Sequence, residues 1–233
     1  MTPLPWSHSL LQAFDTCPRQ FEEVKVLRHF QDKKNDASLW GDRFHKSAEN
    51  FIGGVTSGKP YKPLDGSMLP YSGYLAQFLQ RPGKTLVEQQ YALNRKLQPC
   101  EFFDDDVWCR AIIDVLTVNG TVAHIDDHKT GKNRKKDMQQ LIIFALQTFY
   151  HHPEVNTCHT AFHWVQFGFD ESAKDRETFY RHQIPDLWET LVPKLQRYKA
   201  AFDAGIFPPK SSGLCKRNCA VSTCEYWGAG SRR

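Results

Sequence analysis

Two neighbouring aspartates, Asp126 and Asp127, lie in the segment TVAHIDDHKTGK at residues 121–132, and a third aspartate, Asp114, precedes them. Paired carboxylates bind hard cations such as Mg²⁺ or Mn²⁺, and an ammonium beside them can hold a water or stabilise charge on a phosphate. Lys129, two residues after Asp127, supplies that ammonium. The pattern therefore predicts metal-assisted phosphate chemistry. The competing interpretation is an ordinary polar face of a half-solvated sheet.

The dipeptide Asn119-Gly120 predicts how these side chains are placed. Asn-Gly between two β-rich segments is typical of a two-residue type I′ hairpin. That turn would set Val118 opposite Thr121 and leave Asp114 and Asp127 diagonal to each other, about 7–8 Å apart. We expect one face to carry Asp114, Asp127 and Lys129, and the other to carry His124, Asp126 and His128.

Other segments supply candidate partners for the carboxylates. His45 lies at the edge of an apolar helical stripe, so it is either a metal ligand or a packed surface residue. Gln140 either belongs to the site or caps a helix that begins at Asp137. Glu88, in TLVEQQYAL, is a weaker acidic candidate. His159 and His163 lack an evident carboxylate partner and are interpreted as structural.

A basic run follows the aspartates. Its members are Lys129, Lys132, Arg134, Lys135 and Lys136, and Gly131 makes the backbone within it pliant. Such a run is often only a solvated face, but here it begins at the proposed site. We therefore expect part of it to grip a nucleic-acid backbone.

Four of the seven cysteines form a second constellation. Cys17 is near the N-terminus, whereas Cys215, Cys219 and Cys224 are close together near the C-terminus. Four thiolates can hold a [4Fe-4S] cluster or a zinc ion, and an odd cysteine count argues against a disulfide framework. Ligation would fasten the two ends of the chain together. We interpret the remaining cysteines as small core or ungrouped residues.

Composition and periodicity outline the scaffold. The 233 residues, 40% of them hydrophobic, can bury a substantial core, and the net charge of +4 permits an acidic partner. Without an apolar run of the ~20 residues that a membrane span needs, a cytoplasmic protein is expected. Helices are predicted near residues 7–15 and from Asp186 to Ala204, the latter with a kink or a restart at Pro193. Strands are predicted at residues 158–169 and 178–184.

Several of these motifs together resemble the PD-(D/E)XK nucleases, in particular the RecB-like branch of CRISPR-associated and phage exonucleases. Asp114 on one strand, followed by Asp127-His128-Lys129-Thr130-Gly131 on the next, is similar to the core of that family. The segment Gly41…His45…Glu49 resembles its Gly-x-x-x-His-x-x-x-Glu helix. Gln140…Phe144 resembles its Gln-x-x-x-Tyr helix, with phenylalanine in place of tyrosine. The resemblance spans nearly the whole chain.

The resemblance implies an α/β, restriction-endonuclease-like core with a mixed central sheet flanked by helices. It implies a single nuclease domain over residues 1–233, in which a cysteine-rich clasp at 205–233 packs on the segment around Cys17. The family's clasp holds a [4Fe-4S] cluster with the spacing Cys-x2-Cys-x5-Cys, whereas this chain has Cys-x3-Cys-x4-Cys. A zinc ion is therefore the next alternative, and unligated thiols are the third.

The implied activity is metal-dependent hydrolysis of DNA, from an end. His45, Asp114, Asp127 and the backbone carbonyl of His128 would bind Mg²⁺ or Mn²⁺, while Lys129 and Gln140 would complete the catalytic set. The expected partner is DNA, with further protein partners in recombination, phage or CRISPR systems. The alternative is a non-catalytic DNA-binding or assembly module with the same fold.

Overall fold

The computed structural model describes residues 2–32, 36–56 and 63–229. The chain divides into two compact units. We name them the terminal unit, made of Met1–Asn35 and Glu189–Arg233, and the sheet unit, Asp36–Trp188. Within the described residues, no helix is both long and apolar enough to cross a lipid bilayer.

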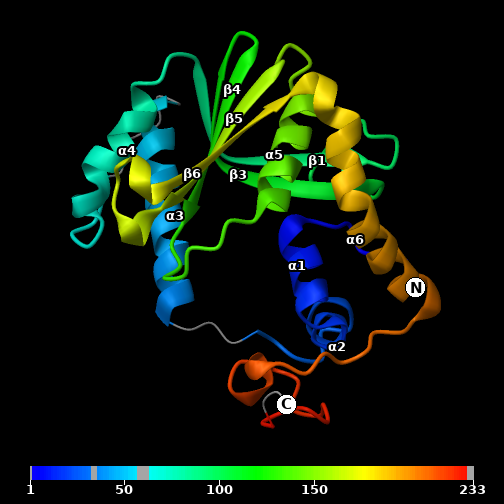
Figure 1. The fold of residues 1–233 in the computed structure, drawn as a ribbon. Coiled ribbons are helices and arrows are strands. Elements are labelled where there is room, and N and C mark those ends of the chain that lie inside the picture. The colour runs from blue at the N-terminus through cyan, green and yellow to red at the C-terminus, as the bar shows by residue number, and fades with distance from the viewer. Residues whose placement is uncertain (1, 33–35, 57–62, 230–233) are drawn as a thin grey trace. The chain divides into compact units, whose positions relative to one another are not determined.

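A six-stranded sheet forms the centre of the sheet unit (Figure 1). Its spatial order is β2-β1-β3-β4-β5-β6. The strands are β1 (Lys84–Asn94), β2 (Pro99–Cys100), β3 (Val107–Asn119), β4 (Val122–Lys129), β5 (Thr157–Trp164) and β6 (Lys174–Tyr180). Strands β4 and β5 are parallel, and the other neighbouring pairs are antiparallel. The predicted mixed α/β architecture is confirmed.

The turn between β3 and β4 lies one residue later than predicted. Val118 pairs with Ala123 rather than with Thr121, so the turn residues are Gly120 and Thr121. Only Gly120 of these two has a positive φ, +56°, which fits a type II′ turn, whereas type I′ needs two positive angles. The predicted register is therefore wrong by two residues. A two-residue shift keeps every side chain on its predicted face, so the expected sharing of faces is unaffected.

Helices cover both faces of this sheet. Helices α3 (Asp36–Thr56) and α4 (Ser72–Leu79) lie on one side, and α5 (Met138–His151) lies on the other (Figure 1). The short 3₁₀ turn η2 (Leu69–Tyr71) leads into α4. α5 begins at the predicted N-cap, because the Asp137 side chain accepts a hydrogen bond from the backbone N–H of Gln139. The core beneath α3 and α4 consists of Phe44, Ala48, Phe51, Ile52, Leu64, Met68, Tyr74, Leu75, Phe78, Val115 and Val165.

The elements after β5 differ from the predicted ones. β5 ends at Trp164, and 3₁₀ turns follow at η3 (Val165–Phe167) and η4 (Glu171–Ala173). β6 ends at Tyr180, and a 3₁₀ turn, η5 (Arg181–Gln183), replaces the end of the predicted strand. Alternation of apolar residues marks extended chain but does not show where the ladder stops.

Helix α6 (Ile184–Ala204) also starts earlier than predicted and is continuous. It begins two residues before Asp186, which lies in the first turn rather than at the cap. Pro185 explains the early start, since the missing N–H of proline costs nothing in a first helical turn. Pro193 lies inside the helix, so of the predicted kink or restart there, the restart is wrong.

The terminal unit is built from short helices around an aromatic cluster. It contains α1 (His8–Thr16), α2 (Pro18–Phe21), the π-helix η1 (Glu22–Val26), the part of α6 from Glu189 onward and η6 (Gly213–Lys216). The Ser7 side chain caps α1 by accepting a hydrogen bond from the backbone N–H of Leu10. The packed rings are those of Phe14, Phe21, Tyr198, Phe202 and Phe207. Asp15 bridges α1 to α6 through ion pairs with Lys194 (2.8 Å) and Arg197 (3.2 Å).

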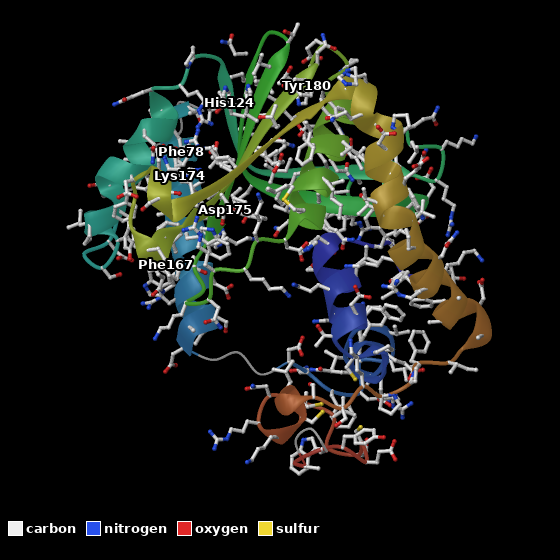
Figure 2. The ribbon with its side chains drawn as sticks, in the orientation of Figure 1. Phe78, His124, Phe167, Lys174, Asp175 and Tyr180 are labelled. Atoms are coloured by element: carbon white, nitrogen blue, oxygen red, sulfur yellow. The ribbon has the colours of Figure 1, made fainter. Side chains whose placement is uncertain are left out.

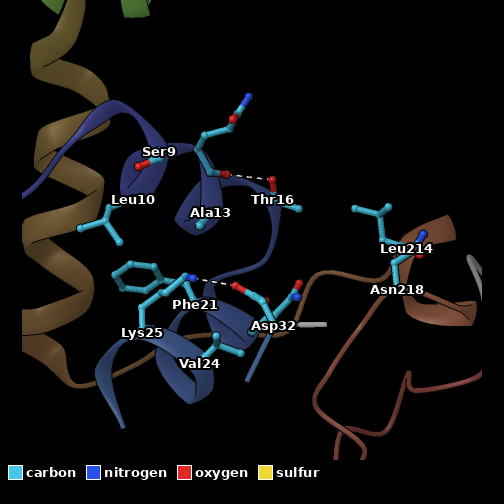
Figure 3. Close-up of a pocket in the computed structure, with 12 residues that line it drawn as sticks. Ser9, Leu10, Ala13, Thr16, Phe21, Val24, Lys25, Asp32, Leu214 and Asn218 are labelled. Carbon is cyan, nitrogen blue, oxygen red and sulfur yellow. Dashed lines mark hydrogen bonds and ion pairs between the residues drawn. The ribbon is translucent and has the colours of Figure 1, made fainter. Parts of the chain in front are cut away.

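A pocket of about 450 Å³ lies within the terminal unit (Figure 3). Residues of α1, of the segment Gln20–Lys25 and of the region around η6 line it, and its wall mixes side-chain amides and hydroxyls with apolar groups. The ion pair between Lys25 and Asp32, at 2.6 Å, belongs to this wall. The pocket is therefore distinct from the cluster of carboxylates in the sheet unit.

Candidate active site

The carboxylates of Asp114 and Asp127 come from neighbouring strands at the point where the β3–β4 ladder ends. Val115 and Asp126 form the last residue pair of that ladder, and one further step sets Asp114 opposite Asp127. The backbone N–H of His128 donates a hydrogen bond to Asp114 Oδ2 at 2.7 Å. The carboxylate of β3 is thus tied to the backbone of β4. The two acids are directly opposite rather than diagonal, as the corrected register requires.

Glu88 brings a third carboxylate to the same region. The residues on either side of Glu88 pair with Val115 and Ile113 of β3, which sets Glu88 opposite Asp114, and Glu88 has a φ of +45°. Such a conformation costs a residue with a side chain on the order of 1–3 kcal/mol and is often found at functional sites. Ligand atoms of Glu88, His45 and Asp114 all lie within 4.8 Å of one another. The strained residue therefore sits where three potential ligands meet.

His45 reaches this cluster from α3. Its Nδ1 lies 3.3 Å from Asp114 Oδ2. One turn earlier in the helix, Gly41 packs against Thr130, directly after β4; a Cβ on Gly41 would lie 2.8 Å from Thr130 Oγ1. Glycine therefore allows α3 to approach the end of β4 closely. The spacing Gly-x-x-x-His then presents His45 to the carboxylates.

Lys129 and Gln140 form a hydrogen-bonded set with Asp127. Lys129 Nζ lies 2.6 Å from Asp127 Oδ2 and donates a hydrogen bond to Gln140 Oε1, also at 2.6 Å. Gln140 Nε2 donates to Asp127 Oδ1 at 2.9 Å. The ammonium also lies 4.6 Å from the centre of the Phe162 ring. Of the two alternatives for Gln140, its side chain takes the site contacts, while Asp137 caps the helix.

Crowding of like charges perturbs the titration of this cluster. Burial and the charge of Asp114 raise the pKa of Asp127, and burial with the same charge raises the pKa of Glu88 to about 7. Burial opposes protonation of His45, but the hydrogen bond to Asp114 and the surrounding carboxylates outweigh it and raise the pKa of His45 to about 9. Burial is the largest cause of the raised pKa of Asp127 and of Glu88, and the charge of Asp114 adds to it; a bound cation would stabilise the ionised form of both carboxylates.

The donor atoms fit a hard divalent cation. One imidazole and several carboxylate oxygens are ligands that suit Mn²⁺ or Mg²⁺. Asp127 Oδ2 is buried and accepts no well-aligned hydrogen bond, although Lys129 Nζ is near it. The structure thus brings His45 and Asp114 together with Glu88, whereas Asp127, opposite Asp114, is not in this group of close ligand atoms among the described residues. The His128 ring points to the opposite face, so only its backbone could contribute a ligand.

The family model of the PD-(D/E)XK nuclease superfamily matches residues 5–226. The chain belongs to the PD-(D/E)XK nuclease superfamily. No curated protein gave a match. A crystal structure from Eubacterium rectale, described as "Putative exonuclease", is similar over 88% of this chain and 83% of that chain, with a TM-score of 0.47 and 12% sequence identity. The predicted superfamily is confirmed, whereas the RecB-like branch stays a prediction.

In this PD-(D/E)XK nuclease, the second of the adjacent aspartates faces the site and the first faces α4. Asp126 Oδ1 accepts a hydrogen bond from His163 Nε2 at 2.7 Å, and the Arg81 guanidinium forms an ion pair with the same carboxylate. The interpretation that His163 lacks a carboxylate partner is therefore wrong. Parallel pairing of β4 with β5 sets Asp126 beside Ala161, two residues from His163, and sequence spacing did not reveal that alignment.

His128 belongs to the same buried layer of the nuclease. Its Nδ1 lies 2.7 Å from the Tyr74 hydroxyl, and its ring meets those of Phe44 and Phe78 edge-on. Burial lowers the pKa of His128 to about 4. The neutral ring packs against α3 and α4 and so anchors β4 from behind the site.

The predicted nucleic-acid contacts divide into two groups. Arg134 donates hydrogen bonds to Asp175 and to the backbone oxygens of Ser172 and Lys174, and Lys136 lies 3.5 Å from Glu177. Lys132 and Lys135 are exposed, and the described residues give them no ion pair. Arg134 therefore ties the basic loop to β6, which leaves the two lysines as its free cations within the described structure.

The four predicted cysteine ligands surround one small cavity of the terminal unit, which Cys17, Cys215, Cys219 and Cys224 all line. Backbone N–H groups of Lys210 and Ser212 donate to the sulfurs of Cys17 and Cys215, each at 3.4 Å. Burial and the three neighbouring thiols raise the pKa of Cys219. All seven cysteines are free thiols. Segments from both ends of the chain thus contribute thiols to one place.

Glu88 is the residue that sequence reasoning undervalued. Its position on an early strand was the available signal, but its backbone angle and its distance from His45 depend on the pairing of β1 with β3. A second three-residue group, Cys100, Asp104 and Asp106, also has close ligand atoms, but its two aspartates are exposed.

Proposed function

We propose that this protein is a metal-dependent DNA nuclease that hydrolyses phosphodiester bonds from a strand end. The observation that carries the proposal is the convergence of Asp114, Asp127 and Lys129 at the end of the β3–β4 ladder, with His45 beside them. Action from an end, rather than internal cleavage, rests on the sequence resemblance to RecB-like exonucleases.

His45, Asp114 and Asp127 would hold Mg²⁺ or Mn²⁺, with the backbone carbonyl of His128 as a further ligand. Glu88 would add another carboxylate to the site. A divalent ion at such a site lowers the pKa of a coordinated water and neutralises charge on the phosphate. The raised pKa values of Glu88 and Asp127, caused first by burial and then by the charge of Asp114, support this assignment, because a bound cation would stabilise their ionised form.

Lys129 would orient the attacking water and stabilise charge that develops on the phosphate oxygens. Gln140 holds the ammonium by accepting its hydrogen bond and fixes Asp127 by donating one. The Phe162 ring beneath the ammonium further restricts its position. These contacts orient the two groups before substrate binds, which reduces the entropic cost of reaching the transition state.

Lys132 and Lys135 would bind phosphates on either side of the scissile bond. Both are exposed and lie on the loop that follows Lys129. Arg134 and Lys136, predicted for the same role, act mainly by holding this loop against β6 through Asp175 and Glu177. Binding through phosphates would be sequence-independent and sensitive to salt.

The four clustered cysteines would hold a structural [4Fe-4S] cluster that fastens the segment 205–233 to the region around Cys17. Within the described residues, no three of these sulfurs all lie within 4.8 Å of one another. A single zinc ion would draw four sulfurs to about 3.8 Å from one another, since Zn–S bonds are about 2.3 Å. A wider separation of the four sulfurs favours a multi-iron cluster. Free thiols also agree with the cytoplasm as the proposed compartment.

The decisive experiment measures cleavage of end-labelled single- and double-stranded DNA, and of circular DNA, with Mg²⁺ or Mn²⁺. Asp114→Ala and Lys129→Ala should abolish cleavage while DNA binding persists. Asp105→Ala, on an exposed loop, is the matched control and should behave as the parent. Equal activity in both site variants and the parent would overturn the proposal. DNA binding without cleavage by the parent would indicate a non-catalytic module in recombination, phage or CRISPR assemblies.

A further inference from the structure

The loop after β5 carries an exposed aromatic ring that the proposed mechanism does not use. Phe167, the last residue of η3, is 49% exposed, and within the described residues it makes no ring contact. Gly168 follows it with a φ of +118°, a backbone conformation that favours glycine. A single exposed apolar side chain is common at a protein surface, so it is the place of Phe167 beside the proposed site that makes it a candidate for binding.

The ring lies on the same edge of the sheet as the catalytic residues. Lys129 and Trp164 are residue partners in the parallel β4–β5 pair, so both strands leave the sheet together. Phe167 follows Trp164 by three residues, a chain reach of at most about 11 Å. Figure 2 shows Phe167, Lys174 and Asp175 at one end of the sheet unit, away from His124 and Tyr180 at the other end.

Contacts hold this loop firmly against the basic loop. Gln166 Nε2 donates to the backbone oxygen of Thr130 at 3.1 Å. Arg134 donates to the backbone oxygen of Ser172 at 2.6 Å from the other side. Phe169 stacks on Tyr74, with ring centres 5.1 Å apart. The Phe167 ring is therefore presented on a fixed support, beside a loop whose free cations are Lys132 and Lys135.

We propose that Phe167 is a stacking surface for a base of a single DNA strand whose phosphates follow Lys135 and Lys132 toward Lys129. This inference rests on the proposed nuclease function and adds a substrate class, single-stranded DNA or a frayed end. The face of every base can stack on an aromatic ring, whereas bases inside a duplex are already stacked on each other. Two lysines and one ring combine backbone attraction with base stacking, as single-strand-binding sites do.

Binding is tested with the full-length protein in an Asp114→Asn background, so that DNA is not consumed. The probes are a fluorescein-labelled single-stranded oligonucleotide, the same sequence as a blunt duplex, and single strands with 2-aminopurine at successive positions. Phe167→Ala should weaken single-strand binding about five- to 150-fold, remove 2-aminopurine quenching at one position, and change duplex binding less than twofold. Phe167→Trp should retain both signals.

Phe103→Ala is the matched control, since Phe103 is 77% exposed on the β2–β3 loop, and it should bind as the parent does. Single-strand binding by Phe167→Ala at the parent's affinity would overturn the inference, and so would an equal loss of single-strand and duplex binding. Cleavage by the otherwise unmodified protein separates the two proposals. If the parent cleaves DNA and Phe167→Ala binds single strands normally, the stacking proposal is refuted and the nuclease proposal is not. A parent that never cleaves but shows Phe167-dependent quenching refutes the nuclease and leaves the stacking site standing.

Discussion

Replacing Gly41 with alanine tests whether close approach of α3 to β4 positions His45. The added Cβ would lie 2.8 Å from Thr130 Oγ1 but 3.7 Å from Thr130 Cβ, so the conflict is with the hydroxyl oxygen alone. To relieve it, either the threonine side chain rotates or α3 moves outward. Movement of α3 would carry His45 away from Asp114, where the Nδ1–Oδ2 distance of 3.3 Å already leaves little margin.

The effect on stability and the effect on activity should differ in size. Alanine in place of glycine within a helix gains about 1 kcal/mol, whereas overpacking costs about 1–3 kcal/mol. The free energy of unfolding should therefore fall by no more than about 2 kcal/mol. Misplacing a catalytic group by about 1 Å costs on the order of 100-fold in rate. Gly41→Ala should thus remain folded and lose most of its nuclease activity.

A double-mutant cycle isolates the contact. Urea unfolding and the Mn²⁺-dependent rate of DNA cleavage would be measured for the parent, Gly41→Ala, Thr130→Ala and the double variant. Thr130→Ala removes Oγ1, so the double variant should recover the activity that Gly41→Ala loses. Gly73→Ala is the control in α4, because a Cβ there meets nothing within 4 Å. Equal activity of Gly41→Ala and Gly73→Ala, or failure of Thr130→Ala to rescue, would refute the reasoning.

Four further predictions address other parts of the molecule. Gln140→Leu should lower kcat at least tenfold with little change in DNA affinity, measured by single-turnover cleavage and anisotropy, because the ammonium loses its acceptor. Arg81→Met should lower the free energy of unfolding in urea by about 2 kcal/mol or more, because it leaves a buried carboxylate without its ion pair. In the presence of a chelator, the free energy of unfolding of the parent should fall as the pH rises from about 4.5 to 7, because the raised pKa of Glu88 makes its ionisation unfavourable in the folded state. Melting curves of Glu88→Gln should show a smaller fall over the same range. Anaerobic preparations should absorb near ~400 nm, and Cys219→Ala should abolish this absorbance whereas Cys100→Ala should not.

The face of the sheet that each side chain occupies was predictable from the sequence, but the register between β3 and β4 was not. Period-two alternation assigns Asp127 to one face and Asp126 to the other whatever the turn, since a shift of two residues preserves both. The turn itself depends on which residues adopt positive φ. Asn119-Gly120 and Gly120-Thr121 both place a glycine at a central position, and type I′ and type II′ turns accept different neighbours. The sequence therefore predicted the correct face for each side chain but the wrong residue opposite it.

Contacts between distant segments mark the limit of sequence reasoning. Gln140 had two acceptable roles until the orientation of α5 placed its amide between Lys129 and Asp127. The positive φ of Glu88 is imposed by its place in the sheet, and no local turn residue signals it. The Arg81–Asp126 pair joins residues 45 positions apart, which no local spacing can indicate. Local pattern predicts which face a residue occupies; only the tertiary fold determines which residue it meets.

The adjacent aspartates show why partners, more than residue type, decide which acid can act. Both are almost fully buried, and burial alone raises the pKa of each. For Asp126, the hydrogen bond from His163 and the charge of Arg81 more than offset burial, so its pKa falls well below the usual range. It is a satisfied anion with no need of a further cation. For Asp127, burial and the charge of Asp114 outweigh the contribution of Lys129, and its pKa rises. Its negative charge is under-compensated, so it is the one of the two that gains from binding a divalent ion.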